Sequence, residues 1–145
     1  MEFDQDTEKL AKAFANNYHT LINKGWVNIL GMYDCSARCM INGKVMLPYE
    51  MVSLLSSNHI SKAKIYNNKL HFMKNVDCLT VSVTSIMALL NDNNYIQKKV
   101  FATDHFRISI SKQKIMEHTC NMRDDIDIKL PDECYSKSYN NFQYY

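Results

Sequence analysis

The chain has 145 residues, about the length of one ordinary domain, with 46% hydrophobic and 22% charged residues. This composition excludes disordered, collagen-like and low-complexity architectures. The net charge is +2 and there is no polybasic block, so the charge pattern does not indicate binding to nucleic acid or to an anionic membrane surface. We therefore expect a globular protein that binds neither.

The N-terminal charge pattern and the cysteines favour the cytoplasm. The first eight residues carry four acids, the reverse of a secretory signal, and the longest apolar stretch, residues 86–90, is far below the ~18 residues of a membrane span. Five scattered cysteines fit a reducing compartment. Cys35 and Cys39 form a C-x3-C pair, but no His or Cys pair follows at zinc-finger spacing, so we expect no metal and no cofactor.

An amphipathic helix is predicted near the start of the chain. Its apolar residues recur at three- and four-residue steps and form one stripe: Leu10, Phe14, Ala15, Tyr18, Leu21 and Ile22. Asp4 or Asp6 can cap its start, and the run Asn23-Lys24-Gly25 supplies its end.

Three shorter elements follow this helix. Residues 27–33 form a second short helix, and residues 36–41 look extended, with Asn42-Gly43 as a hairpin-type turn. Pro48 begins a third helix that runs through residue 55, because proline is preorganised for a first helical position.

Beyond residue 57 the sequence becomes typical of β-strands. Four segments, residues 63–73, 78–90, 98–110 and 114–122, are rich in β-branched or aromatic residues and are separated by polar breaks. Helices followed by a run of long antiparallel strands indicate an α+β fold, with the helices covering one face of a curved sheet. The concave face of such a sheet is where we expect a pocket.

One domain is predicted for residues 1–123. No linker, repeat or change of composition interrupts the chain before about residue 124. The remaining residues, 124–145, are polar, rich in Asn and Tyr, and broken by Pro131. We expect this tail to be a flexible end; packing on a partner subunit is the alternative.

The strand predicted at residues 98–110 has one apolar face that contains a carboxylate, Asp104. Burial of an ionised carboxylate costs free energy, so Asp104 either finds hydrogen-bond donors or takes up a proton. A neutral acid in an apolar cavity can donate to a developing oxyanion. The alternative is a purely structural role, in which Asp104 bonds backbone amides or a hydroxyl on a helix.

The last predicted strand carries a histidine and a thiol on its apolar face, which holds Met116, His118 and Cys120. Ile115 is expected on the opposite face. A three-residue connection, residues 111–113, sets Asp104 opposite Cys120, because paired residues of an antiparallel hairpin have a constant sum of residue numbers.

Asp104, His118 and Cys120 are therefore predicted to converge on one patch. His118 is either an ordinary hydrogen-bonded core histidine or a group that moves protons. Cys120 is most simply an inert buried thiol, and a Cys/His nucleophilic pair lacks a third orienting group.

Tyr18 lies on the buried stripe of the first helix, and its hydroxyl needs a partner there. A helix packed across the concave face could bring this hydroxyl near Asp104, where the two groups would form a two-donor oxyanion hole. Simple aromatic packing is the alternative. We expect Trp26 and Tyr33 to be pocket wall or core, and Phe14 and Phe106 to line the same pocket.

The last two predicted strands resemble those of the nuclear transport factor 2-like superfamily. The run Asp104-His105-Phe106-Arg107-Ile108 is similar to the penultimate strand of the ketosteroid isomerases, and Lys114-Ile115-Met116-Glu117-His118 to the final strand of the SnoaL-like polyketide cyclases. The helices fit the same layout, with Phe14-x3-Tyr18, Asn23-Lys24-Gly25 and Ile29-Leu30-x2-Tyr33. The resemblance covers most of residues 7–123 and implies a SnoaL-like domain, in which a cone-shaped, cystatin-like antiparallel sheet wraps around N-terminal helices.

The resemblance also implies roles for individual residues. Asp104 and Tyr18 match the oxyanion-hole acid and tyrosine of the isomerases, and His118 matches the cyclase histidine. The general base of the isomerases falls near Ile41, where this chain has no carboxylate, and the catalytic acid of the cyclases falls at Cys120. Proton abstraction would therefore need His118, whose ordinary pKa suits that work.

Three functions are compatible with these residues. The first is an enzyme that isomerises, dehydrates or cyclises a hydrophobic carbonyl compound through an enolate. The second is a non-catalytic module that binds an apolar ligand in the same pocket. The third is a dimerisation or adaptor module with a filled interior. A homodimer through the exposed sheet face, with Phe101, Thr103 and Ile115 outward, is expected for most members of the superfamily.

Overall fold

The computed structural model describes residues 5–124. The predicted tail beyond Asp124 and the proposed cap at Asp4 lie outside this range. In chain order the described elements are α1 (Gln5–Lys24), the 3-10 helix η1 (Trp26–Met32), β1 (Tyr33–Ile41), β2 (Lys44–Met46), α2 (Pro48–Ser57), β3 (Lys62–Lys74), β4 (Cys78–Leu90), β5 (Ile96–Ser109) and β6 (Lys114–Asp124).

Helix α1 forms where the apolar stripe predicted it. Among its buried residues, Ala11, Ala15, Tyr18 and Ile22 follow four-, three- and four-residue steps, so they share one face. Leu10 was predicted on this face and is instead 47% exposed, because the buried stripe passes through Ala11. The helix ends at Lys24, as predicted.

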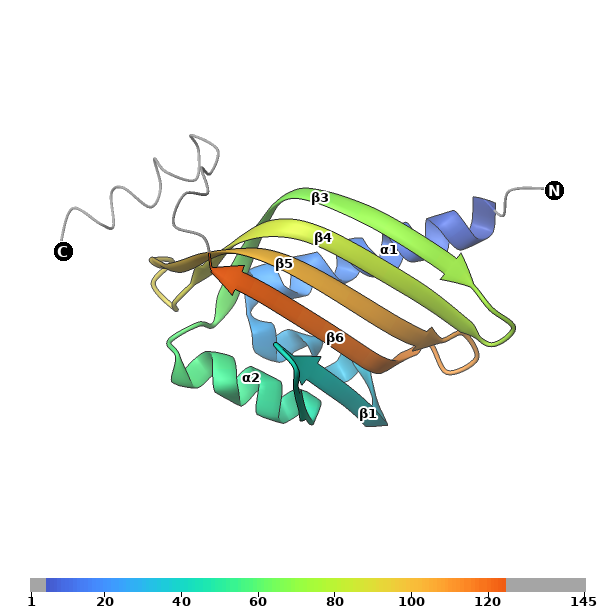
Figure 1. Ribbon diagram of the computed structural model, residues 1–145, viewed down its shortest axis with the longest axis horizontal. Coiled ribbons are helices and arrows are strands. Elements are labelled where there is room, and N and C mark those ends of the chain that lie inside the picture. Colours follow the sequence, from blue (N-terminus) through green and yellow to red (C-terminus); the bar gives the residue numbers. More distant parts are fainter. Residues whose placement is uncertain (1–4, 125–145) are drawn as a thin grey trace.

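The six strands form one sheet in the order β2-β1-β6-β5-β4-β3 (Figure 1). The long strands β3 to β6 pair antiparallel, as expected for consecutive hairpins. Strand β1 pairs antiparallel with β2 but parallel with β6, so the sheet is mixed and not wholly antiparallel. Because β1 and β6 are distant in sequence, no tight turn forces an antiparallel pairing between them.

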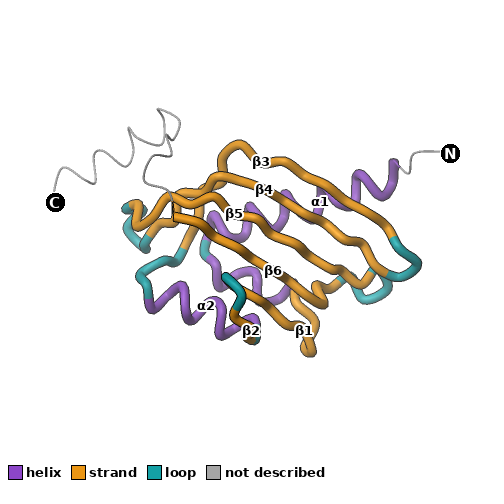
Figure 2. Tube along the Cα trace, in the orientation of Figure 1, coloured by secondary structure: helices purple, strands orange, loops and turns teal. Residues whose placement is uncertain are grey.

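Helices and sheet form two layers, which confirms the predicted α+β class with a curved, unclosed sheet over N-terminal helices (Figure 2). Helix α1 runs behind the long strands and packs mainly on β3, while α2 lies beside β1. The largest fully buried side chains between the layers include Trp26, Tyr18 and Phe106. None of the described helices is long and apolar enough to cross a lipid bilayer.

The hairpin of β5 and β6 sets the register of the interior. Asp104 pairs with Cys120, as predicted, but the route to this register differs from the three-residue connection. Ser109 pairs with Lys114, and a register shift near the start of β6 then restores the predicted pairing. The extra residue at this bulge turns Ile115 inward, where it is 1% exposed, so the prediction that Ile115 faces outward was wrong.

Candidate functional site

Three polar side chains lie between α1 and the inner face of the sheet. Asp104 on β5, His118 on β6 and Tyr18 on α1 are 0%, 1% and 1% exposed. Side-chain alternation along β5 and β6 turns Asp104 and His118 to the same face, together with Cys120. The structure thus brings Asp104, His118 and Cys120 together in the interior.

A chain of two hydrogen bonds runs through His118. Its Nε2 lies 2.7 Å from Asp104 Oδ1, and its Nδ1 lies 2.7 Å from the Tyr33 hydroxyl. With a neutral imidazole, the Nε2–H donates to Asp104 and the Tyr33 O–H donates to Nδ1. Both ring nitrogens are therefore occupied, and the orientation of the ring is fixed from both sides.

Aromatic rings surround the two hydrogen bonds of His118. The Phe106 ring stacks on the His118 ring with centroids 4.2 Å apart and an interplanar angle of 22°. Tyr18 approaches the His118 ring edge-on at 5.7 Å, and Phe14 meets Phe106 edge-on at 4.8 Å. The low polarity of these walls strengthens every electrostatic interaction inside them.

Two polar atoms in the enclosure lack a hydrogen-bond partner among the described residues. They are the Tyr18 hydroxyl and Asp104 Oδ2. Burial raises the pKa of Tyr18 well above its ordinary value, and the negative charge of Asp104 raises it further, so Tyr18 remains a neutral O–H donor. Buried polar groups without partners are rare in native proteins, and such a pair marks a place where a ligand or ordered water can bind.

Two buried thiols adjoin the same cluster. Cys120 lies beside Asp104, and burial, followed by the charge of Asp104 and a hydrogen bond between the two side chains, raises the pKa of its thiol. Cys39 on β1 pairs in register with His118, and burial raises the pKa of its thiol to about 11. Both thiols are therefore protonated at neutral pH, which does not support a nucleophilic role for either.

The other residues that were predicted to line the pocket do not all lie beside the polar cluster. Trp26 and Tyr33 are 2% and 7% exposed and belong to the core, which was one of the two placements expected, and the Tyr33 hydroxyl also hydrogen-bonds His118. Met116 is only half-buried at the bulge, and Ile115 occupies the inward position instead. The position of Cys39 beside His118 was not predicted from the sequence, because it depends on the parallel pairing of β1 with β6.

A groove of about 540 Å³ opens between α1 and the end of the β5–β6 hairpin. Its wall is largely apolar and includes Leu10, Phe14, Met32, Ile108 and Ile115. Phe14 is the link between this groove and the enclosed polar cluster, because its ring contacts Phe106, which in turn covers His118. In the described conformation the groove and the polar cluster are separated by these two rings.

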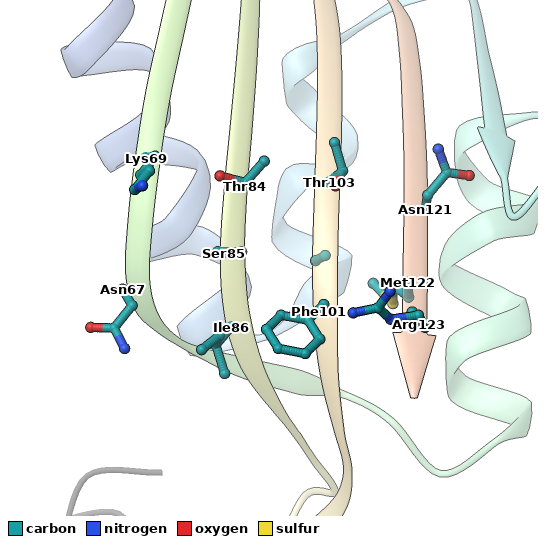
Figure 3. Close-up of a pocket in the computed structure, with 11 residues that line it drawn as sticks. Asn67, Lys69, Thr84, Ser85, Ile86, Phe101, Thr103, Asn121, Met122 and Arg123 are labelled. Atoms are coloured by element: carbon teal, nitrogen blue, oxygen red, sulfur yellow. The ribbon is translucent and has the colours of Figure 1, made fainter. Parts of the chain in front are cut away.

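A second hollow, of about 480 Å³, lies on the outer face of the sheet (Figure 3). Lys69, Thr84, Thr103 and Asn121 form a polar row across four strands. Phe101 lies in the next row, with the Arg123 guanidinium 5.0 Å from its ring centroid. Phe101 and Thr103 thus face outward, as predicted.

Solved structures resemble this chain in fold at very low sequence identity. Mtr2 of Candida albicans has a TM-score of 0.62 and 6% identity, with 86% of this chain covered and 100% of that protein. A candidate dehydratase of the NTF2-like family from Streptomyces avermitilis has a TM-score of 0.57 and 15% identity, with coverage of 81% and 97%. The chain has the nuclear transport factor 2-like fold.

A third structure with this nuclear transport factor 2-like fold is a candidate aromatic ring hydroxylase from Novosphingobium aromaticivorans. It has a TM-score of 0.64 and 10% identity, with 87% of this chain and 98% of that protein covered. No protein-family model and no curated protein matches the sequence. Identities this low establish the fold, and the fold hosts several kinds of function.

The two buried tyrosines of this nuclear transport factor 2-like fold should respond oppositely to loss of the hydroxyl. Tyr33→Phe leaves His118 Nδ1 buried without a donor and should lower the free energy of unfolding by about 1–3 kcal/mol. Tyr18→Phe removes a hydroxyl without a partner and should leave stability unchanged or raise it by up to about 1 kcal/mol. Urea unfolding followed by circular dichroism measures both. An equal loss in the two variants would show that the Tyr18 hydroxyl is also hydrogen-bonded.

Proposed function

We propose that the protein is a small-molecule pocket protein of the SnoaL-like or ketosteroid isomerase-like type, which binds a hydrophobic carbonyl compound. One observation carries this proposal: the Tyr18 hydroxyl and Asp104 Oδ2 are both buried without a hydrogen-bond partner in the described part of the chain, beside a His118 whose two nitrogens are bonded. A structural polar cluster gains stability when every member is paired. A ligand oxygen that accepts from Tyr18 and from a protonated Oδ2 would complete this one.

The groove supplies the apolar part of the binding site. Its volume of about 540 Å³ lies within the usual range for small-molecule pockets, roughly 300–1,000 Å³. A ligand that enters beside Leu10 and Met32 meets Phe14 and then Phe106, so rotation of these two rings would connect the groove with Tyr18 and Asp104. We therefore propose a planar, largely apolar ligand with one terminal oxygen.

The same arrangement can stabilise an enolate. With Asp104 protonated, a Tyr18 hydroxyl and an Asp104 Oδ2–H that both donate to one ligand oxygen would stabilise the charge that develops when a proton leaves the carbon next to a carbonyl. Residue Ile41 occupies the region of the usual carboxylate base, so the proton is taken by the pair of Tyr33 and His118. The Tyr33 oxygen accepts it as its own proton moves to His118 Nδ1. Isomerisation, dehydration and aldol-type cyclisation all use such an enolate.

Binding of a planar fluorescent phenol, an enolate mimic, tests the proposal. The full chain should bind it at micromolar concentration with a spectral shift toward phenolate. Tyr18→Phe and Asp104→Leu should each weaken binding at least tenfold, about 1.4 kcal/mol, since each removes one donor. Tyr49→Phe, at a tyrosine that is 59% exposed, is the matched control and should bind normally.

Two results would contradict the proposed pocket: no binding by the folded wild-type protein, or equal binding by wild type and Tyr18→Phe. Should Asp104→Leu fail to fold, Asp104→Asn keeps a donor and an acceptor at the same position. This variant should then retain binding that Tyr18→Phe loses.

A dimerisation or adaptor module is the second candidate function, and the outer sheet face favours it. Ala88 and Leu90 form a separate apolar cluster there with Ile86 and Phe101, beside the hollow of Figure 3. The Candida albicans protein Mtr2, which has this fold, is found in a complex with the Mex67 M domain. A homodimer through β4 and β5 would cover Ile86 and Phe101, the half-buried members of this cluster.

Light scattering of the full chain at micromolar concentration measures this association. The expected result is a dimer, which Phe101→Glu converts to a monomer because the new charge would be buried in the interface. Val76→Glu, at a residue that is 94% exposed in the turn between β3 and β4, is the control and should leave the dimer intact. A wild-type monomer would contradict the interface.

A further inference from the structure

Three side chains of the interior cluster belong to residue types that commonly bind metal ions. One ligand atom each from Asp104, His118 and Cys120 lies within 4.8 Å of the other two, and all three residues are buried. They come from two neighbouring strands, because Asp104 pairs with Cys120 and His118 is two residues before Cys120. A carboxylate, an imidazole and a thiol on one rigid sheet face make up a donor set that Zn²⁺ commonly takes in proteins.

We propose that Asp104, His118 and Cys120 bind one Zn²⁺ ion inside the cone, with the fourth coordination position facing Tyr18. Three protein ligands and one open position characterise zinc sites that bind or activate a small molecule. The proposal goes beyond the carbonyl site: it concerns a metal that the chain would hold with or without a bound small molecule.

Two buried oxygen atoms support the binding of a cation at this place. Asp104 Oδ2 and the Tyr18 hydroxyl are buried oxygens with no hydrogen-bond partner among residues 5–124, and the pKa of Tyr18 is raised in part by the charges of Asp104 and Cys120. A carboxylate oxygen buried without a full set of donors costs free energy, which a bound cation would offset. A zinc ion would satisfy Oδ2 directly and leave Tyr18 beside the open position.

Tyr33 supplies the outer contact that a zinc-bound histidine normally has. Its hydroxyl lies 2.7 Å from His118 Nδ1, so with Nε2 on the metal the Nδ1–H would donate to Tyr33. Such a bond fixes the ring and its tautomer and is found at most metal-bound histidines. The Phe106 ring, stacked at 4.2 Å, holds the imidazole plane from one side.

Small movements convert the cluster into a coordination sphere. Zinc–ligand bonds of about 2.0–2.3 Å at tetrahedral angles place neighbouring ligand atoms roughly 3.3–3.6 Å apart. His118 Nε2 and Asp104 Oδ1 are 2.7 Å apart, and this hydrogen bond would be lost as zinc binds Nε2 and Oδ2, with the imidazole proton then on Nδ1. Cys120 would lose its thiol proton to solvent on binding.

Refolding with metal tests the site directly, because its ligands are too deeply buried for rapid exchange. The full chain is unfolded with a reductant and a chelator, then refolded with Zn²⁺ or Co²⁺ and desalted. The expected result is one tightly held zinc per chain and, with cobalt, a thiolate-to-cobalt charge-transfer band with tetrahedral visible bands. A refolded chain that retains no stoichiometric metal would overturn the proposal.

A pair of buried thiols gives the matched variants. Cys120→Ser should lose the charge-transfer band and bind zinc at least tenfold more weakly. Cys39→Ser should keep the band and the wild-type zinc affinity, because Cys39 lies outside the ligand set. The two cysteines are equally buried, at 1% exposure. Retention of the band and of wild-type affinity by Cys120→Ser would overturn the proposal.

X-ray absorption of the zinc-loaded wild-type protein gives a test that does not depend on a variant that folds. One sulfur neighbour is expected, with nitrogen and oxygen for the rest; two or more sulfurs would place the ion at other cysteines. The two proposals can fail separately. Phenol binding by the chelated protein without zinc binding would leave the carbonyl site alone, and zinc binding without phenol binding would leave the metal site alone.

Discussion

The buried hydrogen bond between Asp104 and His118 is the interaction on which the organisation of the interior depends. Removing a carboxylate and an imidazole from water costs several kcal/mol unless each finds a partner, and breaking such a buried pair costs about 3–5 kcal/mol. The two groups satisfy each other at 2.7 Å, and Tyr33 satisfies the second nitrogen of the imidazole. The pairing register of β5 with β6, and the bulge at the start of β6, must therefore keep Asp104 and His118 within hydrogen-bond distance.

The enclosing rings explain how one site can serve both folding and binding. Phe106 covers His118, and Phe14 covers Phe106 at the base of the groove, so the interior is closed in the described conformation. The closed state protects the hydrogen bonds from water, and rotation of two rings is a small change compared with opening the sheet. The Tyr18 hydroxyl and Asp104 Oδ2 have no partner among residues 5–124, and these atoms are the reason to propose a ligand for the site.

Local patterns in the sequence were sufficient to predict the elements and the meeting of Asp104 with Cys120, because hairpins join neighbouring strands and alternation fixes their faces. The inward turn of Ile115 was not predicted, since a bulge adds one residue without a compositional signal. The role of Tyr33 was missed for a different reason. It depends on β1 lying parallel to β6, a contact between distant segments that no local pattern specifies. The closure of the groove by Phe14 also depends on tertiary packing.

Nitrogen-15 NMR of the His118 ring tests the central claim most directly, because it reports on both hydrogen bonds in the intact protein. The account predicts one histidine ring N–H proton that exchanges slowly with water, disappears in His118→Asn, and shifts in both Tyr33→Phe and Asp104→Asn. A His118 ring without a protected proton, or one insensitive to both variants, would mean that the ring is not enclosed between Asp104 and Tyr33, and the proposed site would not exist.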